Sequence, residues 1–326
     1  FKPVFNEVKP FIESTNLAIG NLETTISGKA KGYSGYPIFN SPKEFLEALK
    51  YAGFDLLLTA NNHSLDKGAE GVFSTIDNIT KHDMLYNGTF KSKEDRDSIR
   101  VYIVRGIRIC LLAYTYASNI NVKKGEEKFL ISVIDTTDIK NDLMKAENLG
   151  PDLIMVYLHF GDEYSREPSL SQRDIVAKLK SYGADIIFAS HPHVLRPLEF
   201  FESKFGRIDT GFVAYSLGNF ISNQRWRYSD CGVIINFTLE KNIDKDTFHF
   251  SKIEYIPTWV FKGDIDGEQQ YKILPSQQFL GEFEKSDIFL TNHDVERIRE
   301  SYYDTIDILT RSSKPRLQKS KNNFSH

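Results

Sequence analysis

Two histidines separated by one residue, His191 and His193, directly follow the apolar run 185–190. In open α/β sheets the loops at the carboxyl ends of the strands converge on a crevice, and sites form there. Imidazole is the commonest side-chain metal ligand, and a His-x-His pair presents two such ligands from one short loop. The pattern therefore predicts a metal site, although any one of these histidines could instead be a loop residue whose hydrogen bonds are met within the fold.

Three further apolar runs end in the same kind of polar residue. Run 17–20 is followed by Asn21 and Glu23, run 55–59 by Asn61, Asn62, His63 and Asp66, and run 152–158 by His159, Glu163 and Tyr164. Four of the eight histidines of the chain thus follow an apolar run. Because the strand ends of an α/β sheet meet at one edge, we expect these side chains to lie together.

The donors suit a mixed nitrogen and oxygen metal site. Glu23 offers carboxylate oxygens, Asn62 an amide oxygen, and three histidines neutral nitrogens: His159, His191 and His193. A set without thiolate favours Zn, Mn or Fe over a structural, cysteine-rich zinc site. Two ions about 4 Å apart could clamp a phosphoryl group and lower the pKa of a bridging water.

Two residues beside these ligands could move protons. His63 directly follows Asn62 and could protonate a leaving oxygen as a general acid. Asp66 could orient that imidazole through its other nitrogen, but the N-cap of the next helix is an equally good use for it.

Substrate contacts are expected from polar residues in the same loops. The candidates are Asn21, Asn61, Glu163, Tyr164 and Asn219. Asn219 follows the strand 212–217 and could instead be an ordinary turn residue. The basic and aromatic run 224–228 predicts either contact with an anionic polymer, through guanidinium groups and stacking, or a solvated loop.

The composition narrows the class of protein. The 326 residues carry a formal net charge of −3, which gives no electrostatic case for nucleic-acid binding. No run approaches the roughly 18 consecutive apolar residues that a membrane helix needs. The first residues lack the apolar core of a secretory signal. The content of two cysteines fits a reducing compartment and also a bacterial surface protein, so it does not determine the location.

Helical patterns alternate with apolar runs in the first 200 residues. A helix is predicted from Ser41 as N-cap to Gly53, a second from about Glu70, and a third after the capping box Ser169–Gln172. Strand, helix and strand at this spacing indicate crossover units and a mainly parallel sheet.

The pattern changes after residue 208. The strands 212–217, 232–239 and 248–256 are separated by turns rather than helices. With the pair 101–104 and 107–112, they predict antiparallel pairs in a second sheet. Two sheets with helices outside are therefore the expected architecture.

Five of these segments, in this order, resemble the bacterial CapA family of capsule-synthesis, poly-γ-glutamate-associated proteins, also called PgsA-like. They are 21–24, 59–66, 159–164, 191–195 and 215–220, and the resemblance covers about residues 5–259. That family is similar in turn to the calcineurin-like metallophosphoesterases. The resemblance implies an α/β fold, a four-layer α/β/β/α sandwich, with one or two divalent ions (Mn, Fe or Zn).

The resemblance also implies individual roles. The metal ligands fall on Asn62, His159, His191 and His193. His63 looks like the general acid, and Ser190 stands where the family has glycine. Glu23 stands in for a bridging carboxylate, with Asn21 as the competing assignment.

One departure from the family concerns the beginning of the chain. The family starts with a strand that ends in Gly-Asp, whose Asp is a metal ligand, and no such segment precedes Phe1. We therefore expect a sheet without one central strand, a site without one carboxylate, and doubtful catalysis in this form, with a single-metal or degenerate site as an alternative. Since family members are commonly exported or anchored by an N-terminal segment, an extracytoplasmic, membrane-anchored full-length protein is expected.

Two functions follow as expectations. The first is a metal-dependent hydrolase or transferase acting on phosphoester, amide or acyl bonds of a cell-envelope polymer. The second is a non-catalytic envelope assembly or polymer-binding protein. Expected partners are an anionic polymer or small-molecule substrate and other membrane proteins of capsule or polymer synthesis, but no nucleic acid. The expected domains are a metallophosphatase-like unit over 1–265, an extension with a helix over 266–311, and a disordered tail over 312–326.

Overall fold

A computed structural model describes residues 1–120, 128–282 and 289–311. Within these residues the largest sheet has six strands. In spatial order they are β4 (Val101–Val104), β5 (Ile107–Thr115), β6 (Leu153–His159), β7 (Ile186–Ser190), β9 (Thr210–Ala214) and β8 (Leu198–Glu202). The strands β5, β6, β7 and β9 are parallel, which confirms the predicted crossover units.

Two three-stranded sheets lie beside the large one. The first is parallel and contains β1 (Ile19–Asn21), β2 (Leu56–Leu58) and β3 (Leu85–Asn87). The second is antiparallel and contains β10 (Cys231–Asn242), β11 (Thr247–Ile265) and β12 (Glu268–Pro275).

The predicted membership of the second sheet is wrong for two segments. The hairpin β4–β5 and the strand β9 belong to the six-stranded sheet, where β5 pairs with β6 and β9 with β7. The reason is that β4 and β8 pair antiparallel at the two edges of a parallel sheet. Such edge strands need only short turns, so their local pattern does not tell which sheet they extend.

Four of the eight described helices, α2, α3, α6 and α8, lie where a helix is predicted, with one different start, and the other four were not predicted. They are α1 (Lys9–Glu13), α2 (Glu44–Ala52), α3 (Gly68–Lys81), α4 (Lys93–Asp97), α5 (Thr136–Asn148), α6 (Leu170–Ser181), α7 (Ser276–Glu282) and α8 (Asn292–Thr310), with short 3-10 turns at Lys2–Phe5 and Lys29–Lys31. The capping box Ser169–Gln172 begins α6, and Gly53 ends α2 at φ +101°, as predicted. Ser41 does not cap α2, because its hydroxyl bonds the hydroxyl of Thr24 at 3.0 Å and Lys43 is the N-cap.

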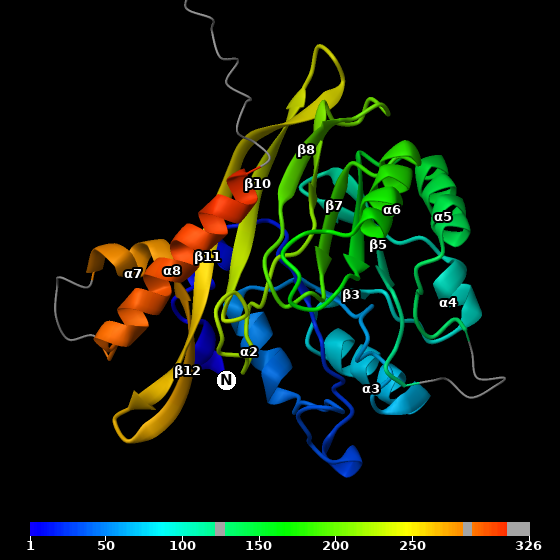
Figure 1. Ribbon diagram of the computed structural model, residues 1–326. Helices are drawn as coiled ribbons and strands as arrows, with labels where there is room; N and C mark the ends of the chain where they lie inside the picture. The colour runs from blue at the N-terminus through cyan, green and yellow to red at the C-terminus, as the bar shows by residue number, and fades with distance from the viewer. Residues whose placement is uncertain (121–127, 283–288, 312–326) are drawn as a thin grey trace, which may run out of the picture.

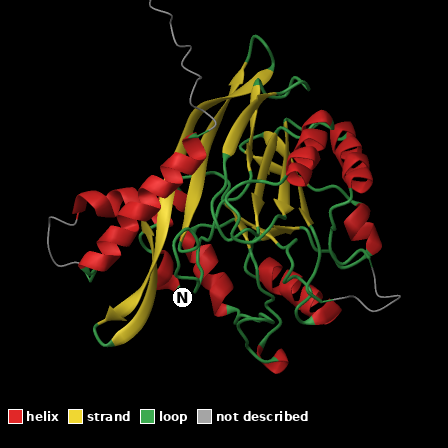
Figure 2. Ribbon diagram, in the orientation of Figure 1, coloured by secondary structure: helices red, strands yellow, loops and turns green. Residues whose placement is uncertain are grey.

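Three apolar clusters order these elements into four layers. One joins the outer face of the six-stranded sheet to α5 and α6. The second lies between the six-stranded sheet and both smaller sheets, and the third joins β1–β3 to α1, α2 and α3. Figure 1 shows α5 and α6 at the right, and Figure 2 shows the strands between outer helices. The α/β class is therefore confirmed, with the layer order helix, sheet, sheet, helix.

The C-terminal helices pack on the antiparallel sheet. Side chains of α7 and α8 pack against Trp259, Phe261 and Leu274 of β11 and β12. Residue 265, where the domain boundary is predicted, ends β11 within the β11–β12 pair. That boundary stays a prediction, and the predicted tail 312–326 lies outside the described residues. None of the helices in the described part combines the length and apolar character needed to span a bilayer.

A buried carboxylate links α8 to this sheet, and its removal is expected to destabilise the fold. Asp230 is 2% exposed and accepts hydrogen bonds from Trp259 Nε1 at 2.9 Å and Arg297 Nη2 at 2.7 Å. We expect Asp230→Ala to lower the free energy of unfolding by about 2–3 kcal/mol, because two donors lose their acceptor. Urea unfolding would measure this. Asp174→Ala, in an exposed pair with Lys178, should change nothing measurable, and equal effects of both variants would contradict the account.

Candidate metal centre

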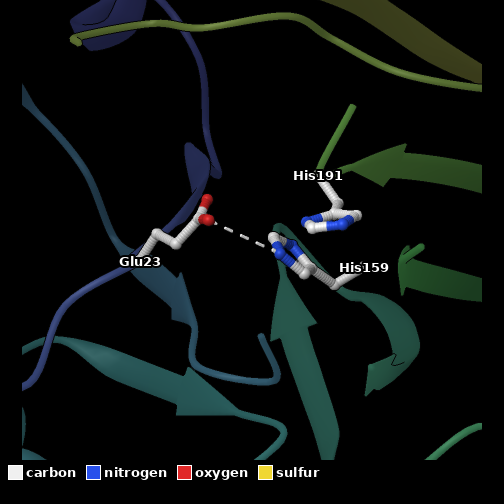
Figure 3. Close-up of side chains that lie close together, drawn as sticks. All are labelled: Glu23, His159 and His191. Carbon is white, nitrogen blue, oxygen red and sulfur yellow. Dashed lines mark ion pairs between the residues drawn. The ribbon is translucent and has the colours of Figure 1, made fainter. Parts of the chain in front are cut away.

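Three predicted ligands from three different segments meet in the structure. Glu23 lies in the loop after β1, His159 ends β6, and His191 follows β7. One donor atom from each lies within 4.8 Å of the other two. Figure 3 shows the Glu23 carboxylate and the two imidazoles pointing toward one another. The ends of two parallel strands and of one strand from the facing sheet therefore converge on one point.

His159 is oriented from both sides of its ring. The side chain is fully buried, and its Nε2 lies 2.8 Å from Asn62 Oδ1 and 3.6 Å from Glu23 Oε1. Its Nδ1 lies 2.9 Å from the hydroxyl of Tyr157, two residues earlier on the same face of β6. A tyrosine hydroxyl both donates and accepts, so it holds this ring in either tautomer. Nε2 thus faces the side-chain oxygens of Asn62 and Glu23 at the centre.

His191 has the features of a metal ligand. The residue has a φ of +105°, its ring centroid is 4.9 Å from that of His159, and its buried Nδ1 has no hydrogen-bond partner among the described residues. Burial, together with the nearby His159, lowers the pKa of His191 to about 3. Its imidazole is therefore neutral at physiological pH, which is the state that binds a metal.

The carboxylate of Glu23 is ionised and held in place. Burial alone would raise its pKa, but the imidazoles of His159, His193 and His63 outweigh burial and lower the pKa to about 2. Asn21 donates from its amide to Glu23 Oε2 at 3.1 Å. The competing candidate Asn21 therefore hydrogen-bonds Glu23 here, and the choice of Glu23 over Asn21 as the bridging ligand stays a prediction.

His193 is positioned by Asn219. Its Nδ1 donates to Asn219 Oδ1 at 3.0 Å, and its ring lies 6.0 Å from that of His191. The amide of Asn219 in turn donates to Gln224 Oε1 and to the Ser229 carbonyl oxygen, at 3.1 and 2.7 Å. Such partners commonly fix the orientation of histidine ligands. Both polar atoms of the Asn219 side chain are thus engaged within the chain. Its predicted role in substrate contact stays a prediction.

The two residues of the predicted proton-transfer pair are hydrogen-bonded to each other, and their role in proton transfer stays a prediction. His63 Nδ1 donates to Asp66 Oδ2 at 2.8 Å, and the same oxygen accepts from the backbone N–H of Phe39 at 2.6 Å. Since the N-cap of α3 is Lys67, the alternative use of Asp66 as a helix cap is not realised. Among the described residues, the contact found for the other ring nitrogen, Nε2, is one of 3.4 Å with the amide of Asn119.

Asn61 ties the two strand ends together. Its amide donates to Asn21 Oδ1 at 3.1 Å and to the Leu22 carbonyl oxygen at 2.8 Å, and its Oδ1 accepts from the backbone N–H of His63 at 3.1 Å. These bonds fix the loop after β1 against the loop after β2. Its predicted contact with substrate stays a prediction.

Glu163 and Tyr164 stand at the exposed side of the centre. Tyr164 is 43% exposed and stacks on His193 with a ring centroid distance of 5.9 Å. Burial and the charges of Glu163 and Glu23 raise the pKa of Tyr116.

Sequence reasoning missed two aromatic residues of the centre, Tyr157 and Tyr116, and for a third, Phe39, it predicted only that the aromatic loop 33–40 could form one wall of a pocket. Tyr157 orients His159, Tyr116 packs on His191 at 4.6 Å between centroids, and Phe39 meets His63 edge-on at 4.4 Å. Tyr157 could have been found from the two-residue period of its strand, and Tyr116 from its place directly after β5. Phe39 lies in a long loop, and no pattern in the sequence connects it to His63.

The support from Tyr157 leads to a testable expectation. We expect Tyr157→Phe to weaken divalent-metal binding about tenfold, because the partner that orients a ligating imidazole is lost. Titration with Mn²⁺ followed by calorimetry would measure this. Tyr102→Phe removes another buried tyrosine hydroxyl, which bonds Tyr86 and Asn87, and should leave metal affinity unchanged. Equal affinity in wild type and Tyr157→Phe would contradict the orienting role.

The centre opens into a large cavity. A space of about 850 Å³ lies between β1 and β10, and its lining extends from Arg105 at the β4–β5 turn to Glu23, His191 and His193. Apolar side chains of the facing sheets and of α2 form most of its wall. The polar residues of the centre therefore face a mainly apolar interior on one side and solvent on the other.

Comparison with known proteins relates this chain to proteins of capsule synthesis. Residues 1–224 match the family described as bacterial capsule synthesis protein PGA_cap. Capsule biosynthesis protein CapA of Bacillus anthracis is 29% identical over 246 residues, covering 73% of this chain and 58% of that protein. PGA biosynthesis protein CapA of Bacillus subtilis is 28% identical over 245 residues, covering 73% and 62%. The chain thus spans about three-fifths of the length of these relatives.

Solved structures with a similar course of the chain include a nucleotidase and a calcineurin-like phosphoesterase. The NAD nucleotidase of Haemophilus influenzae aligns with a TM-score of 0.48 and 12% identity, covering 92% of this chain and 56% of that one. The calcineurin-like phosphoesterase YfkN from Bacillus subtilis aligns with a TM-score of 0.39 and 14% identity, covering 80% and 73%.

Proposed function

The chain belongs to the family of bacterial capsule synthesis proteins PGA_cap, and from this premise we propose that it carries a metal-dependent hydrolase site for a cell-envelope polymer or phosphoester. The observation that carries the proposal is the convergence of Glu23, His159 and His191, whose donor atoms lie within 4.8 Å of one another. The relatives named for capsule and PGA biosynthesis make capsule or poly-γ-glutamate production the proposed setting.

The residues of the centre fit a divalent ion. The buried Nδ1 of His191 lacks a partner among the described residues, and a buried polar atom without a partner is unfavourable unless something binds it. Glu23 and His191 are both in the unprotonated state that ligands need. With nitrogen and oxygen donors and no thiolate, Mn, Fe or Zn is proposed, as one ion or two.

The ligand set would be Glu23, His159 and His191, joined by His193 from the loop after β7 and by Asn62 from the loop after β2. When bound, a divalent ion supplies a Lewis acid and lowers the pKa of water. The chain's own residues then bind and orient the reacting group. Asn219 and Tyr157 keep His193 and His159 in position through the bonds described above.

The proton for the leaving group is assigned to His63. Asp66 accepts from Nδ1 of His63, which stabilises the imidazolium and leaves the Nε2 proton available to a leaving oxygen. His63 is close enough to Glu23 for its charge to lower the pKa of that carboxyl, so acid and ligand share one site. This arrangement favours a hydrolase over a site that only binds.

Elemental analysis together with an activity assay tests the proposal. The purified chain would be incubated with Mn²⁺, Fe²⁺ or Zn²⁺, desalted, analysed for metal, and assayed with bis(p-nitrophenyl) phosphate and γ-glutamyl p-nitroanilide. Near-stoichiometric metal with turnover of either substrate is expected. Metal without turnover would favour a polymer-binding or assembly role, and no metal under any condition would overturn the site. Membrane anchoring and contact with other synthesis proteins belong to the same proposed setting.

A further inference from the structure

Four aromatic side chains surround the exposed side of the metal centre. We call them the aromatic rim: Tyr36, Tyr116, Tyr164 and Trp226. Their exposed fractions are 86%, 42%, 43% and 52%. Contiguous exposed apolar surface on a soluble domain commonly marks a binding site.

The rim is joined to the centre by ring contacts. Tyr116 lies on His191 at 4.6 Å, and Tyr164 stacks on His193 at 5.9 Å with 27° between the planes. Trp226 meets Tyr164 at 5.4 Å. A ligand at the ligand histidines would therefore have aromatic faces beside it.

Tyr36 extends the rim on the side of the proton-transfer pair. Its ring is 6.4 Å from Phe39, and Phe39 meets the ring of His63 at 4.4 Å. The rim thus borders both the ligand histidines and the candidate general acid. Substrate entering either side of the centre would pass these rings.

The basic residues next to the rim are used elsewhere. Arg227 pairs with Asp304 through two contacts of 3.0 Å. Arg225 donates to the Val260 carbonyl oxygen and lies 5.0 Å above the Trp259 ring. The predicted contact of the run 224–228 with an anionic polymer therefore lacks free guanidinium groups at these two positions.

Arg166, the basic residue two positions after Tyr164, is also engaged. It donates to the Asp304 carbonyl oxygen at 3.2 Å and lies 4.1 Å above the ring of Tyr228. The exposed charge that adjoins Tyr164 is instead a carboxylate, Glu163. Exposed aromatic faces beside a carboxylate suit a ligand with apolar C–H faces and hydroxyl donors better than a polyanion.

We propose that the aromatic rim binds a sugar ring, so that the substrate presented to the centre is a saccharide of the cell envelope. The C–H face of a pyranose packs on Trp226 and Tyr164, and its hydroxyls donate to the carboxylate of Glu163. The inference rests on the proposed function for the reaction, but binding of the sugar is separable from turnover. It assigns the recognition of the substrate to aromatic rings that are separate from the proposed metal ligands.

Tryptophan fluorescence gives a direct assay, because the chain has two tryptophans and they differ in exposure. Trp259 is 1% exposed, whereas Trp226 is 52% exposed and lies in the rim. Titration with chitotetraose, a neutral saccharide, is expected to change the fluorescence of Trp226, and calorimetry would give the affinity. A tetramer of γ-linked glutamate at the same concentrations is expected to bind more weakly.

Variants separate the rim from other aromatic surface. Trp226→Ala and Tyr164→Ala are expected to weaken chitotetraose binding about tenfold, as judged by calorimetry, because a stacking face is lost. Tyr164→Phe keeps the ring and should keep most of the affinity. Tyr303→Ala removes a 62% exposed ring on α8 and should leave the affinity unchanged.

The outcomes distinguish this inference from the proposed function. Metal content would be measured on the same samples, with and without Mn²⁺. Metal binding without saccharide binding, or tighter binding of the γ-glutamate tetramer, would overturn the sugar site alone. Saccharide binding in a chain that takes up no metal would support the rim and remove the proposed hydrolase. Equal affinity of wild type and both alanine variants would also overturn the inference.

Discussion

Replacing His191 and His193 together by alanine is expected to remove bound divalent metal while the chain stays folded. The loss of one positioning partner alone commonly weakens a metal site 10- to 100-fold, so the loss of two ligands should exceed about 100-fold. The fold should survive because neither imidazole belongs to the apolar clusters that join the layers. Elemental analysis, circular dichroism and thermal unfolding would measure both parts of the expectation.

The matched control is a histidine outside the centre. His293 is an exposed residue in the first turn of α8, and His293→Ala should leave both metal content and unfolding unchanged. An unchanged metal content in the double variant would remove His191 and His193 from the ligand set. A double variant that fails to fold would be replaced by each single variant, measured in the same way.

The second large effect is expected at His63. His63→Ala should retain the metal content of the wild type and lower kcat for bis(p-nitrophenyl) phosphate by about 100- to 10,000-fold, the usual contribution of a general acid. The metal should stay because His63 is not a member of the group of donors that converge on one point. Stopped assays at several pH values, with metal analysis on the same preparations, would measure the effect.

Asp66→Asn provides the graded control for this pair. The change keeps the size of the side chain but removes the charge that stabilises the imidazolium, so its activity should fall between those of wild type and His63→Ala. Loss of metal in His63→Ala would identify His63 as a ligand instead of the acid. Equal activity of His63→Ala and wild type would leave the leaving group without the assigned proton donor.

The strand ends of the centre were predictable because each follows an apolar run and carries a polar residue. Strands β6 and β7 are buried along almost their whole length, so their sequences read as continuous apolar runs that stop at His159 and Ser190. Topology places parallel strand ends at one edge. This reasoning needs no knowledge of side-chain contacts, which is why it locates the cluster.

The remaining features depend on contacts distant in the sequence. Whether Phe39 lies on His63 is decided by the packing of a loop that has no periodic pattern. Whether Arg227 pairs with Asp304 of α8 is decided by how the loop that carries Arg227 packs on that helix. The same holds for the capping of α2, where the hydroxyl of Ser41 is drawn away by Thr24. The local sequence shows which hydrogen bonds a side chain such as Ser41 can make, and tertiary packing decides which of them forms.

The left-handed backbone at His191 and His193 has a consequence for how this centre could be lost. Their φ values of +105° and +59° lie where a side chain raises the energy by about 1–3 kcal/mol and glycine does not. Directed evolution toward heat resistance alone would therefore favour glycine at both positions, and the resulting proteins would be sturdier and unable to hold a metal. At these two residues, a substitution that raises stability also removes a proposed metal ligand.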